Sequence, residues 1–188
     1  GVTSSGKTEV FLQAIERVIQ KGKNAIMLVP EISLTPQMLN RFTSRFPNNV
    51  AVLHSGLSDG EKFDEWQRII TGDAKIVIGA RSAIFAPLKN LGVIIIDEEH
   101  DSSYKQDSPA PRYNGRDTAL MMYQLENTTS GTNSCNIILG SATPSLEEMY
   151  NCLTGRHIRV ELTERYHGAE DAEIEIIDTK AERRKNGM

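Results

Sequence analysis

The sequence has 188 residues, of which 39% are hydrophobic and 24% are charged, and its formal net charge is −4 at pH 7. This length suits one large domain or a small pair of domains, and the acidic balance argues against the broad basic surface that binds duplex DNA regardless of sequence, although a few cations could line a groove for a single strand. No apolar run is long enough to span a membrane and no secretory leader is recognisable, so we expect a cytoplasmic protein without a membrane partner.

The first element is a phosphate-binding loop followed by a helix. Residues 1–8 read Gly-Val-Thr-Ser-Ser-Gly-Lys-Thr and match the pattern G-x-x-x-x-G-K-[ST] at every position. In such a loop backbone N–H groups point at phosphate oxygens, while Lys7 reaches the β- and γ-phosphates and the Thr8 hydroxyl binds Mg²⁺. Apolar residues then recur at helical spacing from Phe11 to Ile19, so a helix aims its positive end at the same phosphates. The expected nucleotide-binding residues are Gly1, Val2, Thr3, Ser4, Ser5, Gly6, Lys7, Thr8 and Glu9.

Strands and helices alternate after this first helix. Helical spacing predicts one helix that begins near Pro36 and another that begins after Ser58, which forms a possible capping box with Glu61. Short apolar runs predict buried strands at residues 25–29, 50–53, 75–79 and 92–97.

The second half of the chain continues this alternation. We expect a polar loop over residues 102–114, a helix over 116–125, a surface connection over 127–134, a strand over 135–140 and a helix over 144–153. Beyond them, Ile158, Val160 and Leu162 alternate with polar residues, and Ile174, Ile176 and Ile177 predict a closing strand. The pattern as a whole predicts an α/β fold with a mostly parallel sheet and helices on both faces. Because a phosphate-binding loop normally follows a strand, we expect the first strand to be missing and the sequence to be a fragment of a longer protein.

Two carboxylates end the most apolar strand. Asp97 and Glu98 follow residues 92–96 directly, at the edge of the sheet where open α/β sheets bind ligands. Asp97 is expected to hold Mg²⁺ through water beside Thr8, and Glu98 to orient the attacking water. The alternative for an acidic pair at a strand end is a helix cap or a solvated turn.

The two cysteines and His54 are of residue types that often bind metals, but here they are expected to have structural roles. Cys135 and Cys152 lie in different predicted elements without zinc-ligand or disulfide spacing, so both are expected to be buried small hydrophobic residues. His54 stands alone at a strand end and is expected to be a hydrogen-bonded structural residue.

Two further motifs carry a family resemblance. The run Asp97-Glu98-Glu99-His100 resembles the D-E-x-H box of superfamily-2 helicases, and Gly140-Ser141-Ala142-Thr143-Pro144 resembles their S-A-T motif. More narrowly, the sequence resembles the PriA family of primosomal replication-restart DNA helicases. The segments that carry this narrower resemblance are residues 1–10, 28–32, 34–37, 54–55, 79–87 and 103–106.

The resemblance implies a RecA-like P-loop NTPase domain, the first of two motor domains, over residues 1–165. Residues 166–188 would then supply a closing strand and a linker toward the second motor domain. The implied activity is ATP-dependent unwinding of DNA, 3′ to 5′, in replication restart and primosome assembly at stalled or branched forks. Its cofactors would be ATP and Mg²⁺, with zinc only in a part of the parent protein outside this sequence. Its partners would be single-stranded and branched DNA, other primosome proteins and single-strand-binding protein, and the fragment alone would be inactive or nearly so.

The resemblance also implies roles for particular residues. Lys7, Asp97, Glu98 and His100 would be catalytic, and Ser141 and Thr143 would couple the site to movement. The implied DNA-binding residues are Pro30, Glu31, Arg81, Ser82, Tyr104, Lys105, Arg112 and Tyr113.

These DNA-binding roles have structural alternatives. Arg81 could instead pair with a surface carboxylate, and the two tyrosines could merely pack on the domain. The chain also departs from the family at Ser4, where relatives often have glycine, and at residues 108–111, where another aromatic residue is expected.

Four other kinds of protein remain to be separated from a PriA-like helicase. A small-molecule P-loop kinase or a GTPase would explain residues 1–8 but not the box at Asp97 together with Ser141 and Thr143, and a GTPase should carry N-K-x-D, which is absent. A nucleotide-binding interaction module without motor activity would be expected to lose Lys7, Asp97 or Glu98. Another superfamily-2 DNA translocase shares the general motifs.

Overall fold

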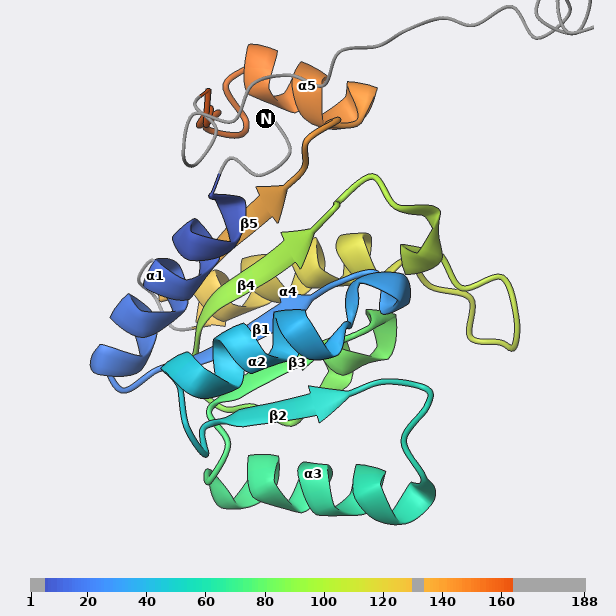
Figure 1. Cartoon of the computed structure of the whole chain (residues 1–188). Helices are drawn as coiled ribbons and strands as arrows, with labels where there is room; N and C mark the ends of the chain where they lie inside the picture. The colour runs from blue at the N-terminus through green and yellow to red at the C-terminus, as the bar shows by residue number, and fades with distance from the viewer. Residues whose placement is uncertain (1–5, 130–133, 164–188) are drawn as a thin grey trace, which may run out of the picture.

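The apolar runs of the sequence form one parallel sheet. The computed structural model describes residues 6–129 and 134–163, and its five strands lie in the order β2-β3-β1-β4-β5, each parallel to its neighbours (Figure 1). The strands are β1 Asn24–Leu28, β2 Val50–Leu53, β3 Ile76–Gly79, β4 Leu91–Asp97 and β5 Asn136–Gly140. The helices are α1 Lys7–Gln20, α2 Pro36–Arg45, α3 Asp59–Thr71, α4 Gly115–Thr129 and α5 Leu146–Leu153, with 3₁₀ turns η1 Glu31–Ser33, η2 Arg81–Phe85 and η3 Ser102–Tyr104. The expected α/β fold with a parallel sheet is confirmed.

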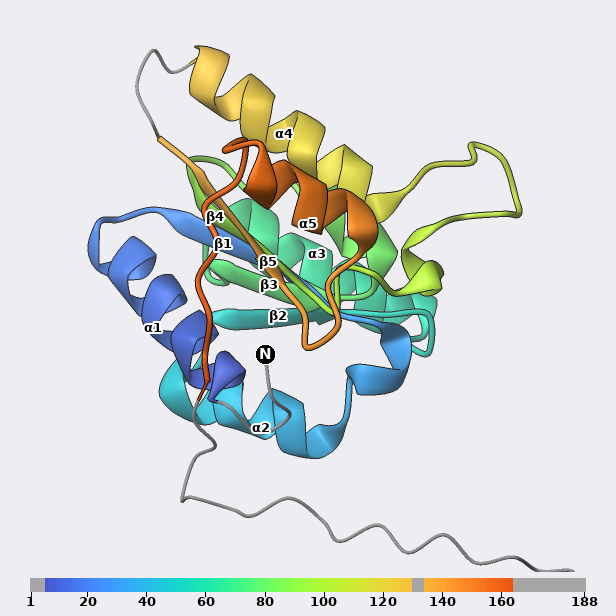
Figure 2. The same ribbon diagram turned by 90° about the horizontal axis from the view of Figure 1, so that it is seen from above.

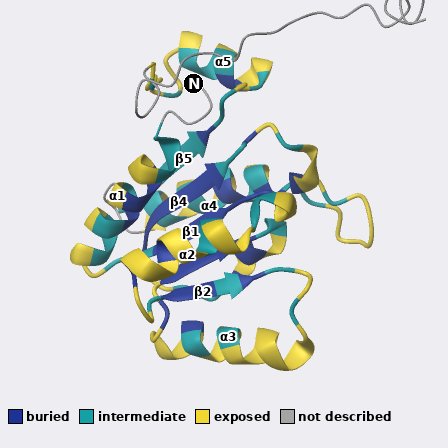
Figure 3. Cartoon of the chain, in the orientation of Figure 1, coloured by how far each residue is buried: buried dark blue, intermediate teal, exposed yellow. Residues whose placement is uncertain are grey.

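The strand order explains why the central strands are so apolar. β3, β1 and β4 each have a strand on both sides, and helices cover both faces of the sheet (Figures 1 and 2). All four residues of β3 are buried, as are six of the seven residues of β4. The edge strands β2 and β5 are less completely buried, and the exposed surface lies mainly on the outer sides of the helices (Figure 3). Strands buried on both faces read as continuous apolar runs, as these do.

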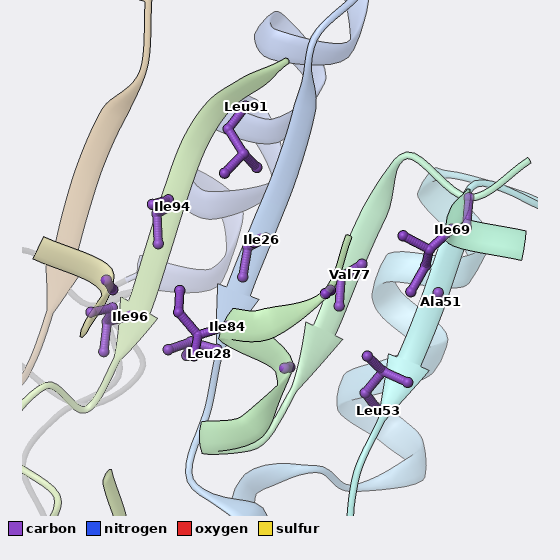
Figure 4. Close-up of a cluster of buried hydrophobic side chains, with 14 of the residues drawn as sticks. Ile26, Leu28, Ala51, Leu53, Ile69, Val77, Ile84, Leu91, Ile94 and Ile96 are labelled. Carbon is purple, nitrogen blue, oxygen red and sulfur yellow. The ribbon is translucent and has the colours of Figure 1, made fainter. Parts of the chain in front are cut away.

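The core is divided by the sheet into two clusters. On β4, Val93 and Ile95 join the cluster under α1 and α2, while Ile94 and Ile96 join the cluster under α3 and α4. Figure 4 shows the second cluster, to which neighbouring strands contribute alternate residues. The two-residue period of a strand places successive side chains on opposite faces, so every strand anchors both helical layers.

Short-range signals place the helix ends. The Thr35 hydroxyl accepts a hydrogen bond from the backbone N–H of Met38 at 3.2 Å, so α2 begins at the proline that follows this cap. Ser58 and Glu61 form the expected capping box at the start of α3. Side-chain oxygens at these positions satisfy N–H groups that the first turn of a helix leaves unpaired. The predicted starts of both helices are therefore confirmed.

The helix α4 is longer than predicted. It continues to Thr129, so residues 127–129 belong to the helix and not to a surface connection. Asn127 explains the extension, because its side-chain amide donates to the carbonyl oxygens of Tyr123 and Cys135 and accepts from the Cys135 N–H, at 3.0–3.1 Å. This amide fastens the end of α4 to the residue that precedes β5.

The segment after α5 also differs from the prediction. Residues 158–163 form no strand, and Ile158 and Val160 are 94% and 80% exposed, because no described strand pairs with them. Cys135 is buried as expected, but Cys152 is only partly buried. Gly1 to Ser5 of the phosphate-binding loop and the closing strand expected at residues 174–177 lie outside the described residues. No helix in the described ranges is long and apolar enough to cross a membrane.

Candidate functional site

The ends of β4 and β5 and the start of α1 meet at the carboxyl edge of the sheet. Asp97, the last residue of β4, is paired in register with Gly140, the last residue of β5. A Cβ atom built on Gly140 would lie 2.5 Å from Cζ of Phe11 and 3.4 Å from Cδ of Lys7. Only glycine lets β5 end this close to the first turns of α1, so Gly140 sets the distance between the two halves of the site.

The described end of the predicted phosphate-binding loop, Gly6, begins α1. Gly6 is the N-cap, with φ of +85°, and its carbonyl oxygen accepts hydrogen bonds from the N–H groups of Glu9 and Val10. Thr8 is half-buried in this first turn, whereas Glu9 is exposed and its carboxylate accepts from Gln13 at 3.1 Å. The N-terminus of a helix carries partial positive charge, which favours a phosphate ahead of it.

The lysine of the loop contacts both predicted carboxylates. Nζ of Lys7 lies 2.7 Å from Oδ1 of Asp97 and also donates a hydrogen bond to Oε1 of Glu98. Burial acts to lower the pKa of Lys7, but the hydrogen bonds and charges of the two carboxylates outweigh it and raise that pKa above its ordinary value. Lys7 thus lies between the two carboxylates that were predicted to be catalytic with it.

Glu98 has an unusual backbone conformation. Its φ is +46°, in the left-handed region that a residue with a side chain rarely adopts, and its N–H donates to Oδ1 of Asp97 at 2.9 Å. Such conformations cost on the order of 1–3 kcal/mol and tend to occur where the surrounding structure fixes a side chain for function. Here the turn leaves the Asp97 and Glu98 carboxylates together on the side of Lys7.

His100 joins this acidic turn to the segment after β5. Its Nδ1 lies 2.8 Å from Oγ of Ser141 and 3.8 Å from Oε2 of Glu98, and its Nε2 lies 3.3 Å from Oγ1 of Thr143. Ser141 also accepts a hydrogen bond from the N–H of Thr143 at 2.9 Å. The two residues expected to couple the site to movement thus contact the same imidazole.

The sequence analysis assigned no role to Glu99, which lies between the predicted catalytic residues Glu98 and His100. Its side chain is 1% exposed, and its carboxylate accepts from the N–H and hydroxyl of Ser145 at 2.8 and 3.2 Å and from Arg116 at 3.2 Å. One signal was available, because Ser145 begins an S-x-x-E pattern and does cap α5. No sequence pattern marked Glu99 itself, whose carboxylate holds this cap.

Tyr104 does not have the predicted role. It is 1% exposed, its ring belongs to the core cluster under α3 and α4, and its hydroxyl donates to the carbonyl oxygen of Asp97 at 2.6 Å. Burial raises the pKa of this phenol well above its ordinary value. Tyr104 was expected to bind DNA, but in this structure its ring is buried beneath the end of β4, in line with the alternative that this tyrosine packs on the domain.

Arg81 is also used inside the protein. Its Nη1 donates to the carbonyl oxygens of Ser103 and Lys105 at 3.0 and 2.7 Å, its Nη2 donates to Oε1 of Gln106 at 3.0 Å, and its guanidinium lies 5.5 Å from the ring centre of Tyr113. No described residue accepts a hydrogen bond from its buried Nε. The partners are carbonyl groups rather than the surface carboxylate of the alternative, so Arg81 holds the following loop instead of presenting its charge to solvent.

That loop, residues 105–114, is closed upon itself. Lys105 and Asn114 form an isolated antiparallel bridge, and the N–H of Gln106 donates to the carbonyl oxygen of Tyr113 at 2.8 Å. Lys105 and Arg112 are exposed, whereas Tyr113 is partly buried in an edge-to-face contact with Phe85, with 5.0 Å between ring centres. The loop projects beyond the sheet (Figure 1).

The remaining predicted DNA contacts lie after β1 and in η2. Pro30 is buried, and Glu31 is exposed but accepts a hydrogen bond from the N–H of Ser55 at 3.1 Å. Ser82 is exposed. His54 accepts from the N–H of Gly56 at 3.1 Å, which confirms its structural role.

Comparison with known proteins identifies the type of domain. Residues 1–152 match the family model of the DEAD/DEAH box helicases. The chain is 52% identical over 184 residues to the replication restart protein PriA of Bacillus subtilis, with 98% of this chain and 22% of that protein covered. It is 50% identical over 188 residues to the protein of the same name from Synechocystis sp., with 97% and 22% covered.

Two further comparisons agree. The chain is 44% identical over 188 residues to PriA of Haemophilus influenzae, with 100% of this chain and 25% of that protein covered. Among solved structures it resembles RecG bound to a three-way DNA junction, with a TM-score of 0.54 and 26% identity over 81% of this chain and 18% of that one. The chain thus spans a quarter or less of the curated relatives described here.

Proposed function

Because the chain belongs to the DEAD/DEAH box helicase family, we propose that it is the ATP-binding motor domain of a DNA helicase that acts in replication restart. The observation that carries this proposal is the contact of Lys7 with Asp97 and Glu98 at the edge of the sheet. A phosphate-binding lysine beside the acidic end of a strand is the arrangement that phosphoryl transfer requires. A nucleotide-binding module without hydrolysis would have no need of Glu98 beside His100 and Ser141.

The described residues fit a magnesium–nucleotide complex. The site offers an ammonium, a hydroxyl and two carboxylates beside a helix N-terminus, and Gly140 keeps the wall opposite Lys7 free of a side chain. Among the described residues no group of three or more His, Cys, Asp or Glu side chains could hold a metal by itself. Mg²⁺ characteristically takes one or two protein ligands and completes its shell with phosphate oxygens and water. Thr8 and Asp97 would supply the protein ligands, and Mg²⁺ would neutralise charge on the β- and γ-phosphates.

The remaining residues would act on the phosphates and the attacking water. Lys7 would exchange its present carboxylate partners for phosphate oxygens when nucleotide binds. Glu98, released from that contact, would orient the water and accept its proton. His100 would report the change to Ser141 and Thr143, because its ring touches both hydroxyls as well as lying near Glu98.

The DNA-binding surface would lie on the exposed part of the same edge. Ser82, Lys105 and Arg112 are exposed there, and Tyr113 is only partly buried. Cations and a partly exposed ring suit the phosphates and bases of a single strand. The substrate that we propose is single-stranded and branched DNA, in keeping with relatives named as replication restart proteins and with a RecG structure solved on a three-way DNA junction. Primosome proteins and single-strand-binding protein are the partners proposed from the family resemblance.

The RecG structure favours a second candidate. That protein was solved on a three-way junction, so a translocase that moves on branched DNA without a part in restart would use the same domain. The two candidates share ATP-driven movement and differ in what is assembled on the DNA afterwards. Identity of 44–52% to PriA proteins, against 26% to RecG, supports the restart role.

The proposal is tested with the full-length gene product. ATP hydrolysis should rise on addition of single-stranded or forked DNA, and a forked duplex should be unwound 3′ to 5′. Residues 1–188 alone should unwind nothing, because an arginine supplied by a second domain contributes about 10³- to 10⁵-fold in related phosphoryl transfers. A full-length product that binds ATP but never hydrolyses it, with or without DNA, would refute the motor role. A product that unwinds forks yet fails to restore primosome loading in a restart-deficient reaction would leave the second candidate.

A further inference from the structure

A buried ionic cluster lies behind the candidate site and has no part in the chemistry described above. Glu99 is one of two buried charged residues in the described ranges, the other being Glu148. Its carboxylate is paired with Arg116, whose side chain is 12% exposed. A buried ion pair contributes little net stability compared with apolar residues of similar volume. Stability alone therefore does not account for the pair of Glu99 and Arg116.

Arg116 joins three carboxylates from three parts of the chain. Its Nη1 lies 3.2 Å from Glu99, its Nη2 lies 2.8 Å from Glu147 on α5, and its Nε lies 3.2 Å from Asp117. Burial acts to lower the pKa of the guanidinium, but the hydrogen bonds and charges of Glu147 and Asp117 outweigh it and raise that pKa. An arginine side chain stays charged in any case. The contact with Glu147 links the start of α4 to the start of α5.

One end of the cluster adjoins the projecting loop. Arg116 is the second residue of α4, and its N–H donates to the side chain of Asn114 at 2.9 Å. Asn114 is also the residue that closes loop 105–114 by pairing with Lys105. A displacement of the loop would therefore reach Arg116 through Asn114, the last residue of the loop.

The other end adjoins the nucleotide site. The N–H of Glu99 donates to the carbonyl oxygen of Gly140 at 3.1 Å, and its carboxylate holds Ser145, so Glu99 grips residues 140–145 at both ends. His100 grips the same segment in its middle, at Ser141 and Thr143. The turn that carries Glu98 and the segment after β5 can therefore move only together.

We propose that Glu99 and Arg116 are positioning residues that transmit displacement of loop 105–114 to Glu98 and His100. The inference rests on the proposed function, since it assumes that DNA meets the loop and ATP meets Lys7. Neither residue touches substrate. Arg116 carries the displacement from the start of α4, and Glu99 passes it to both sides of the nucleotide site. Coupling between sites is reciprocal, so bound nucleotide must also alter the loop.

The test compares two conservative variants in the full-length gene product. Glu99→Gln keeps an acceptor for Ser145 but removes the charge that faces Arg116. Arg116→Lys keeps a positive charge but replaces the planar guanidinium, which reaches its three carboxylates from three nitrogen atoms, with a single ammonium. The matched control is Arg45→Lys, in which the arginine pairs with Glu16 at 2.7 Å on the surface, away from the site.

The measured quantity is the ratio of the ATPase rate at saturating single-stranded DNA to the rate without DNA. We expect this ratio to fall about 2- to 30-fold in Glu99→Gln and Arg116→Lys, the range seen for residues along coupled networks. The double variant should fall no further than the more affected single variant, and Arg45→Lys should keep the wild-type ratio. A structural role alone would lower both rates in parallel and leave the ratio unchanged, which would overturn the inference.

A second measurement needs no hydrolysis. Amide hydrogen exchange of residues 105–114 should change when ADP and Mg²⁺ bind in the absence of DNA, and Arg116→Lys should abolish this change while Arg45→Lys retains it. No response of the wild-type loop to nucleotide would also overturn the inference. If wild-type hydrolysis is stimulated by DNA but both variants keep its ratio, the inference alone fails. If the wild-type product shows no DNA-stimulated hydrolysis, the proposed function fails with it.

Discussion

Nζ of Lys7 lies 2.7 Å from Oδ1 of Asp97, which joins the first turn of α1 to the end of β4. The contact occupies the ammonium that the sequence motif assigns to phosphate. Under the proposed function, nucleotide binding would exchange these carboxylates for phosphate oxygens around the same cation. Because this exchange would also release Glu98, one side chain would link nucleotide binding to the activation of that carboxylate.

The close approach at Gly140 leads to a prediction about stability. Gly140→Ala should destabilise the protein by about 1–3 kcal/mol, since its Cβ would lie 2.5 Å from Cζ of Phe11 in a packed interior. Gly60→Ala is the matched control, because Gly60 lies in α3 with no atom within 4 Å of an added Cβ. That change should stabilise by about 0.5–1 kcal/mol through helix propensity. Chemical denaturation measures both, and equal effects of the two changes would contradict the packing argument.

The buried phenol of Tyr104 makes stability depend on pH. Burial raises its pKa in the folded state above the ordinary value of 10.0. Above pH 10 the unfolded chain therefore loses this proton while the folded chain keeps it, and stability falls by at most about 1.4 kcal/mol per pH unit for the one group. Tyr104→Phe should flatten the decline above pH 10, and should cost about 0.5–1.5 kcal/mol at neutral pH through the lost hydrogen bond to Asp97.

The control for Tyr104→Phe is Tyr150→Phe, because Tyr150 is exposed on α5. It should leave both the neutral stability and the alkaline decline as in the wild type. Unfolding free energies measured between pH 8 and 11 give the comparison. A Tyr104→Phe profile as steep as that of the wild type would show that another group causes the decline.

The loop residues Arg112 and Tyr113 should govern stimulation by DNA. Tyr113→Ala removes a ring that packs on Phe85 and is only partly buried, and a base stacked there would be worth about 1–3 kcal/mol. We expect the DNA-stimulated ATPase rate of the full-length product to fall by about 5- to 150-fold in Tyr113→Ala. Arg112→Ala should weaken binding of the strand, with a smaller salt dependence than that of the wild type.

Tyr113→Phe is the control for that prediction, since it keeps the ring and its contact with Phe85. It should retain most of the stimulation. If Tyr113→Ala and Arg112→Ala are both stimulated as strongly as the wild type, the loop only connects η3 to α4. That outcome would mean that Arg112 and Tyr113 belong to a packed surface loop without a role in DNA stimulation.

The sequence predicted those parts of the molecule that local rules determine. Ser58 and Glu61 form their capping box within four residues, and the strand at β2 has the predicted limits because its apolar run is flanked by polar turns. It was also possible to predict that Lys7, Asp97 and Glu98 lie close together, because parallel strands end at one edge of a sheet. These inferences need only the chain near each residue and the general topology of the fold.

The residues whose roles were not predicted from the sequence are those whose contacts lie far along the chain. Tyr104 was expected to face DNA, but its burial depends on how the chain returns beneath β4. Arg81 was expected to bind DNA, yet it donates hydrogen bonds to carbonyl groups of Ser103 and Lys105. Glu99 was passed over because its partners, Arg116 and Ser145, follow it only after long intervening segments. No periodicity or spacing reports such partners.

The central claim is that Lys7, Asp97 and Glu98 form one ATP-hydrolysing site, and mutant kinetics of the full-length gene product test it most directly. Lys7→Ala should reduce DNA-stimulated ATP hydrolysis by about 10²- to 10³-fold, as expected when a group that stabilises transition-state charge is removed. Glu98→Gln should bind a fluorescent ATP analogue within a few-fold of the wild type yet lose turnover to a similar extent, whereas Lys62→Ala, a surface change on α3, should hydrolyse ATP normally. Wild-type turnover by either Lys7→Ala or Glu98→Gln would contradict the account.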